Sequence, residues 1–187
     1  MERIEVIPYQ PSWPTEYTAH VEQLLPSIRN QISRIDHIGS TSVPGLAAKD
    51  IIDIQISVPN LTNAFVETMI GLGYRYHPHL TDHSPPGADP NLWQKQVFSE
   101  PEGIRRINIH VRRLGAPNMQ QSLLFRDYLR AHPASAAAHG MLKTRLAEKH
   151  AEDREFYYAI KDPVFEIIWE AAQYWATDRG WRYDADV

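Results

Sequence analysis

The sequence contains no cysteine among its 187 residues. This absence excludes disulfide bonds, thiolate nucleophiles and cysteine-ligated zinc sites. Its longest apolar runs are too short to span a bilayer. The opening Met-Glu-Arg-Ile-Glu-Val lacks the basic region and apolar run of a signal peptide. We therefore expect a cytoplasmic protein with no membrane partner.

Neither sign of charge dominates the chain, whose formal net charge is -4. That value provides no general attraction to nucleic acid or to anionic membranes, although a local basic patch is compatible with it. The sequence also lacks an aromatic and basic stacking pattern, so nucleic acid is not an expected partner. The HExxH, GxSxG and P-loop motifs are absent, which leaves zincin, α/β-hydrolase and P-loop kinase functions without support.

Hydrophobic periodicity predicts an α+β fold in a single domain spanning residues 1–187. The part that contains the sheet covers about residues 1–115, and C-terminal helices cover about residues 117–177. Strands are predicted at 34–38, 50–58, 92–98 and 104–112, the last two as an antiparallel hairpin, and residues 3–9 are predicted as a short strand or an extended lead-in. Helices are predicted at 15–25, 61–72, 118–131, 134–150 and 153–176.

A glycine- and hydroxyl-rich turn follows the predicted strand 34–38. Gly39 permits a sharp bend and the close approach of another group. Ser40, Thr41 and Ser42 supply hydroxyl and N–H groups, which would form an anion site if the chain turns helical there. The alternative is a tight turn with a purely structural role.

Asp53 lies on the polar face of the next predicted strand, whose isoleucines occupy the other face. If the two strands pair, Asp53 lies next to the turn. A phosphate held at the turn would then share a divalent cation with Asp53. Lys49, just before this strand, either contacts the same anion or is a surface charge.

The predicted strand 104–112 places Arg106, Asn108, His110 and Arg112 on one face. This polar and partly cationic face suits phosphate or carboxylate recognition. Within it, His110 is a candidate catalytic group that steadies charge or acts as an acid or base. The alternative for His110 is a packed, hydrogen-bonded histidine.

Two helical cations complete the candidate phosphate-binding set. Arg130 ends the segment FRDYLR, and Lys161 follows Tyr157 by one helical turn. Both either reach the cleft or make structural contacts on their own helix faces.

The stretch DHIGSTSVPGLAAKDIIDI at 36–54 resembles the GrpB family. The resemblance continues in VIPYQPSWP near the N-terminus, INIHV at 107–111, FRDYLR at 125–130 and Lys143, and so spans nearly the whole chain. It implies a mixed sheet of the nucleotidyltransferase type with C-terminal helices. Related domains also occur fused to dephospho-CoA kinases.

The resemblance further implies magnesium bound by carboxylates on the strand that carries Asp53. Here Asp53 fills the first position, but Gln55 stands where a second carboxylate is expected. The neighbouring strand offers Asn108 and His110 in place of an acid. The expected magnesium ligands are therefore Asp53 and Gln55, a set with a single negative charge.

Three functional hypotheses follow. The first is an enzyme, or former enzyme, that binds a nucleotide or other phosphorylated small molecule, with magnesium-dependent nucleotidyl transfer as its reaction. The second is a non-catalytic module that binds a metabolite or protein, linked to coenzyme A metabolism by the fusions. The third is an interaction protein, whose mark would be an exposed apolar stripe on residues 153–176.

Overall fold

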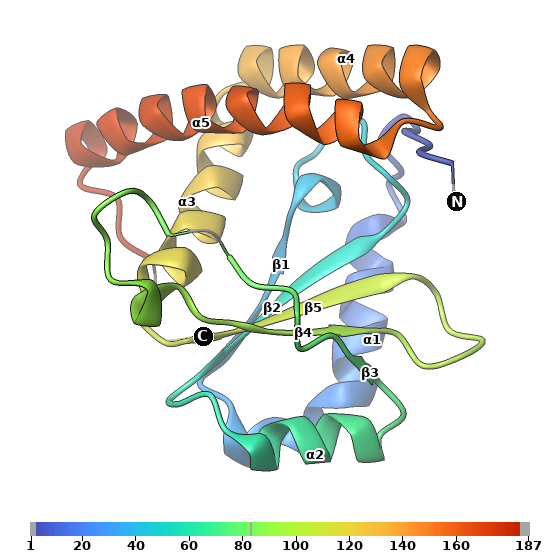
Figure 1. Ribbon diagram of the computed structural model, residues 1–187, viewed down its shortest axis with the longest axis vertical. Helices are drawn as coiled ribbons and strands as arrows, with labels where there is room; N and C mark the ends of the chain where they lie inside the picture. The colour runs from blue at the N-terminus through green and yellow to red at the C-terminus, as the bar shows by residue number, and fades with distance from the viewer. Residues whose placement is uncertain (1–2, 83, 184–187) are drawn as a thin grey trace.

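A computed structural model describes residues 3–82 and 84–183 of the chain, which form a mixed sheet and two groups of helices (Figure 1). The helices are α1 (Trp13–Ile28), α2 (Asn63–Gly71), α3 (Pro117–Ala131), α4 (Pro133–His150) and α5 (Arg154–Arg179). The strands are β1 (Arg34–Ile38), β2 (Ile52–Val58), β3 (Arg75–Tyr76), β4 (Gln96–Ser99) and β5 (Ile107–Arg113). Short 3₁₀ helices are η1 (Arg29–Gln31), η2 (Ser40–Ser42) and η3 (Pro90–Trp93).

The five strands form one sheet in the order β1-β2-β5-β4-β3. The central pair, β2 and β5, is parallel, and the other pairs are antiparallel. The antiparallel pairing of β4 with β5 is the hairpin that the sequence predicts. This mixed sheet, followed by a helical C-terminal part, confirms the α+β fold.

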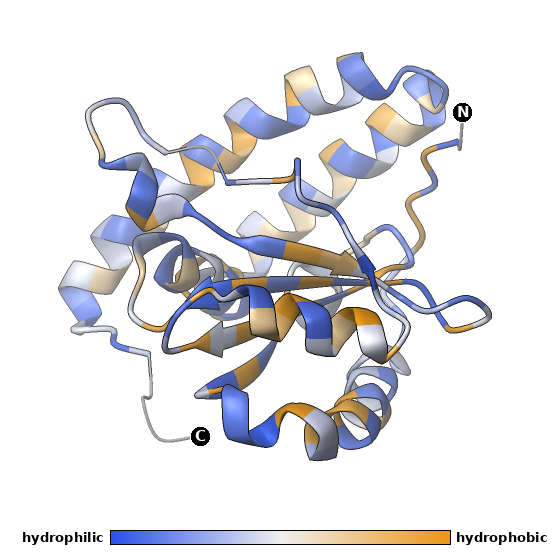
Figure 2. Cartoon of the chain, turned by 60° about the horizontal axis from the view of Figure 1, so that its bottom comes forward, coloured by the Kyte–Doolittle hydropathy of each residue, from blue (hydrophilic) through white to orange (hydrophobic). Residues whose placement is uncertain are grey.

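The two faces of the sheet have different coverings because its central strands alternate apolar and polar residues (Figure 2). On the apolar face, Ile54 and Ile109 are fully buried in a core that includes Trp13 of α1 and Phe65 of α2. The other face receives α3, and α4 and α5 lie side by side beyond it (Figure 1). The polar face is therefore enclosed between the sheet and the C-terminal helices.

The structure differs from the strand prediction in two segments. The segment 3–9 contributes only an isolated bridge between Ile7 and Ala48, because it runs beside a loop rather than a strand. The predicted strand 92–98 begins instead as η3, and β4 starts at Gln96. Among the described residues, no helix is both long and apolar enough to cross a membrane.

Candidate functional site

The turn after β1 and the carboxylate of Asp53 meet in space. Ile38, the last residue of β1, pairs with Asp53 in the antiparallel register of β1 and β2. Gly39 follows with a φ of 68°, and a Cβ at this position would lie 2.3 Å from Oδ2 of Asp53. Only glycine therefore fits between the bend and the carboxylate.

The hydroxyl groups of the turn have separate roles. The Thr41 hydroxyl lies 3.0 Å from Nε2 of His37, and the Ser42 hydroxyl donates to the Gly39 carbonyl at 2.6 Å. The N–H of Ser42 also donates to the Gly39 carbonyl, within the turn. Thr41 and Ser42 thus stabilise the turn, and the phosphate contacts predicted for their side chains do not fit this geometry. Ser40 differs, because its hydroxyl accepts from the Lys143 ammonium at 2.6 Å.

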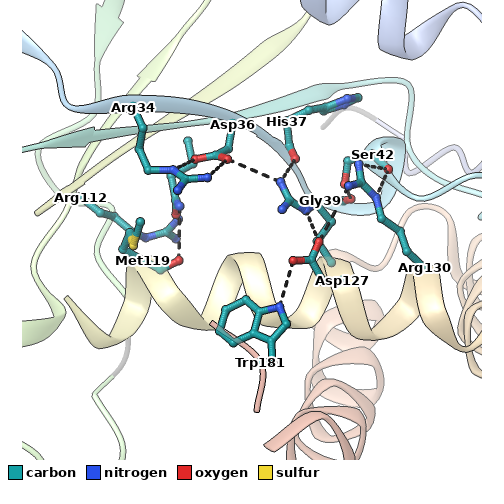
Figure 3. Close-up of polar contacts among 12 residues, drawn as sticks. Arg34, Asp36, His37, Gly39, Ser42, Arg112, Met119, Asp127, Arg130 and Trp181 are labelled. Atoms are coloured by element: carbon teal, nitrogen blue, oxygen red, sulfur yellow. Dashed lines mark hydrogen bonds and ion pairs between the residues drawn. The ribbon is translucent and has the colours of Figure 1, made fainter. Parts of the chain in front are cut away.

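Arginines of α3 hold the turn in place (Figure 3). The Arg130 guanidinium donates twice to the Ser42 carbonyl, at 3.0 and 2.8 Å. Arg126 donates to the His37 carbonyl at 3.1 Å and to Asp127 at 2.7 Å. Arg130 therefore makes a structural contact, which was the alternative to phosphate binding in the sequence analysis. The contact supports the turn from the side of α3.

Asp53 is held by the neighbouring strand β5. Its Oδ1 accepts from the Asn108 amide at 3.0 Å and lies 3.7 Å from Nε2 of His110. Burial opposes ionisation of Asp53, but contacts with His110 and Asn108 and the charge of Lys49 outweigh it and lower the carboxyl pKa. Asp53 is therefore an anion at neutral pH.

His110 is a neutral imidazole in this environment. Burial lowers the pKa of His110, although Asp53 acts in the opposite direction. Its Nδ1 is buried and has no hydrogen-bond partner among the described residues. Because Nδ1 is buried, Nε2, which faces Asp53, is the nitrogen through which His110 would accept a proton as a general base.

Gln55 and Arg112 lie on the same polar face, but α3 covers them. Gln55 is fully buried, its Oε1 accepts from Arg112 at 2.7 Å, and its amide donates to the Met119 carbonyl at 3.2 Å. Arg112 also donates to Asp82 at 2.9 Å. This geometry therefore does not favour the metal-binding role predicted for Gln55 or the phosphate-binding role predicted for Arg112, because the Gln55 carbonyl and two nitrogens of Arg112 already have protein partners.

A cavity of about 520 Å³ opens at the uncovered end of this face. Asn108 and His110 line it, and so the cavity reaches the groups that hold Asp53. Its lining includes the cations Arg3, Lys49, Lys95, Arg106 and Arg154, with Glu5 and Asp50 as the acids. We call this space the cationic cavity. Lys49 and Arg106, two of the residues predicted to bind phosphate, therefore line the cavity that an anion would enter.

Tyr158 of α5 lies close to two lysines at the edge of the cationic cavity. The Lys49 ammonium donates to the Tyr158 hydroxyl at 2.7 Å, and that of Lys161 lies 5.5 Å from the ring centroid. Burial opposes ionisation of Tyr158, but the hydrogen bond from Lys49 and the nearby charges outweigh it and lower its pKa. Lys161 also pairs with Asp162 at 2.6 Å, so it lies beside the cavity lining with a partner of its own.

Lys143 of α4 is the main residue that the candidate list lacked. Burial, with repulsion from Lys161, lowers the pKa of Lys143 to about 7, although Asp53 acts in the opposite direction. Its ammonium reaches Ser40 from 103 residues away in the chain. The sequence marked Lys143 only as part of the family resemblance, and no local spacing predicted this contact. Tyr158, Lys95 and Arg154 were missed for the same reason.

Comparison with known proteins decides the family. A family model described as GrpB protein matches residues 3–171. The chain belongs to the GrpB family. A solved structure, the conserved protein GrpB from Enterococcus faecalis, matches with a TM-score of 0.75 at 28% identity, covering 91% of this chain and 99% of that one.

The curated relatives of this GrpB chain include longer proteins. A dephospho-CoA kinase of Mycolicibacterium paratuberculosis is 36% identical, and the match covers 96% of this chain and 48% of that protein. The UPF0157 protein PA4798 of Pseudomonas aeruginosa is 36% identical over 89% of this chain and 66% of its own length. The chain thus spans about half the length of the dephospho-CoA kinases that it matches.

Magnesium remains a prediction that the donor set of this GrpB chain does not favour. Among residues 3–82 and 84–183, no group of three or more His, Asp or Glu side chains is placed to hold a metal ion. With Gln55 bonded to Arg112, the predicted pair of ligands reduces to the carboxylate of Asp53. These residues do not fit a magnesium ion held by the protein, because such sites use more oxygen ligands and more negative charge.

Helix α5 also carries exposed apolar residues. Ile160, Ile167 and Tyr174 recur every seventh residue, and their exposed fractions are 40%, 69% and 72%. Exposed apolar residues on this helix are the feature expected under the third hypothesis, that of an interaction protein.

The contact between Gly39 and Asp53 gives the first prediction, because Gly45 provides a matched control. Gly45 also has a positive φ, of 78°, but nothing lies within 4 Å of the Cβ position. We expect Gly45→Ala to lower the free energy of unfolding by about 1–2 kcal/mol through backbone strain. Gly39→Ala should cost a further ~1–3 kcal/mol, because Asp53 must move and because the Gly39 backbone, with a ψ of -173°, lies in a region that residues other than glycine rarely adopt. Urea denaturation of both variants measures the difference, and equal losses would contradict the contact.

Proposed function

We propose that this GrpB chain binds a nucleotide or another phosphorylated small molecule in the cationic cavity. The observation that carries the proposal is the gathering of five cationic side chains around the Asn108 and His110 groups that hold Asp53. Phosphate oxygens are strong acceptors for ammonium and guanidinium donors. Because the net charge of the chain is -4, this local excess of positive charge is not a consequence of composition.

The size of the cationic cavity supports a ligand larger than a single phosphate. Its volume of about 520 Å³ lies within the range of ~300–1,000 Å³ typical of small-molecule sites. Dephospho-CoA kinases are among the relatives of this chain. We therefore propose dephospho-CoA and ATP as the first ligands to test.

Removal of a cation from the lining should weaken binding. Lys49→Ala deletes an ammonium group that faces the cavity, and a charge-assisted hydrogen bond contributes about 1.5–3 kcal/mol. We expect the affinity for ATP or dephospho-CoA to fall about tenfold or more in isothermal titration calorimetry. Arg145→Ala is the control, because it removes the same charge from an exposed side chain of α4. Equal effects of the two substitutions would place the ligand elsewhere.

Nucleotidyl transfer is the finer hypothesis, and the arrangement of His110 and Asp53 favours it. In such a reaction an acceptor hydroxyl would attack the α-phosphate of a nucleoside triphosphate and pyrophosphate would leave. The neutral His110 ring would take the proton of the hydroxyl, and Asp53 would stabilise the resulting imidazolium. The cationic lining would offset charge on the departing pyrophosphate.

Asp53→Asn separates catalysis from binding, because it removes the carboxylate charge with little change in shape. If the chain is an enzyme, pyrophosphate release from a nucleoside triphosphate should fall at least 100-fold while calorimetric binding is retained. No turnover in either form, with binding retained in both, would support the non-catalytic module instead.

The low pKa of Lys143 predicts a pH dependence of binding. The pKa of the free protein's Lys143 is about 7, and a nearby phosphate raises it because the anion favours the charged ammonium. Affinity should therefore be complete below about pH 7 and fall as the pH rises above it, by up to ~tenfold per unit. Lys143→Met should abolish this dependence. Titration of both proteins at each pH cancels the ionisation of the ligand itself, and parallel pH profiles would contradict the linkage.

A further inference from the structure

The carboxylate of Asp53 already has close neighbours on both of its oxygens. Oδ1 accepts from Asn108 at 3.0 Å and lies 3.7 Å from the His110 ring. Oδ2 lies against the backbone of Gly39, where even a methyl group would not fit. Asn108 presents its N–H donor to the carboxylate, and a donor in that position occupies a lone pair that a metal ion would need.

Two aspartates near Asp53 and the cationic cavity are bound to cations of the protein. Asp82 pairs with Lys95 at 2.6 Å and with Arg112 at 2.9 Å. Burial opposes its ionisation, but the charges and hydrogen bonds of Arg112 and Lys95 hold the pKa of Asp82 well below its usual range. Asp50 similarly accepts from the Trp13 ring and from Arg105. Neither acid is therefore available as a second ligand beside Asp53.

Besides the neighbouring His110, lysines act electrostatically on Asp53. Asp53 interacts electrostatically with Lys49, Lys95 and Lys143, which come from three separate parts of the chain. A divalent cation at Asp53 would face the ammonium groups of Lys49 and Lys143, whereas the charge of Lys95 is already offset by Asp82. A ligand carrying several phosphate charges would instead be attracted by the same lysines.

We propose that the cationic cavity binds an oligophosphate, such as a nucleoside triphosphate or inorganic triphosphate, without a divalent cation. Lysine and arginine side chains of the protein supply the charge neutralisation that a bound magnesium ion commonly supplies. This proposal rests on the proposed function, because it concerns the ligand of the same cavity. It adds that the metal-free form of the ligand is the one that binds.

The first test compares binding of inorganic triphosphate, and separately of ATP, in EDTA and in excess magnesium. We expect calorimetric binding in EDTA, and a weaker apparent affinity in magnesium because the metal sequesters the free ligand. Binding that requires magnesium would overturn the metal-free proposal while leaving the proposed function intact. No binding in either buffer would contradict the proposed function and with it this proposal.

The second test creates the carboxylate that the site lacks. Asn108 is paired directly with Asp53 in the register of β2 and β5, so Asn108→Asp places two carboxylates side by side. We expect this variant to bind Mg²⁺ alone in calorimetry, and the wild-type protein to show no such binding. Asn30→Asp adds the same charge at an exposed position in η1 and is the matched control. Binding of Mg²⁺ alone by the wild-type protein would overturn the proposal, whatever the stability of the variant.

Discussion

The close contact between the Gly39 backbone and the Asp53 carboxylate is the constraint on which the candidate site depends. It follows from the antiparallel register of β1 and β2, which ends at Ile38 and Asp53. Because the bend is fixed there, Ser40 projects toward Lys143. The guanidinium of Arg130 holds the far side of the turn, so the bend is supported from the helical layer as well as from the sheet.

Positively charged side chains cluster near Asp53, although the net charge of the chain is -4. The loop before β2 supplies Lys49 and α4 supplies Lys143, and both charges act on Asp53, while α5 adds Arg154 to the lining of the cationic cavity. Burial, with additional repulsion from Lys161 and Lys49, lowers the pKa of the Lys143 ammonium to about 7. Repulsion between these cations destabilises the free protein. A bound phosphate would offset that repulsion, so binding is favoured.

The local sequence pattern predicted the central strands and the turn beside Asp53. The alternation in β2 identified both its buried isoleucines and the polar face of Asp53, and the glycine-rich bend placed the turn. The pattern did not show that α3 would cover Gln55 and Arg112, because helix position on a sheet is decided by tertiary packing. For the same reason it did not single out Lys143, a residue brought in by a helix far along the chain.

The central claim is that protein cations, gathered beside Asp53, hold the phosphates of the ligand. A crystal structure of the protein grown with inorganic triphosphate in EDTA tests it most directly. The account predicts phosphate oxygens inside the cationic cavity, within hydrogen-bonding distance of Lys49. Triphosphate bound outside this cavity, in a crystal where the cavity is accessible, would contradict it.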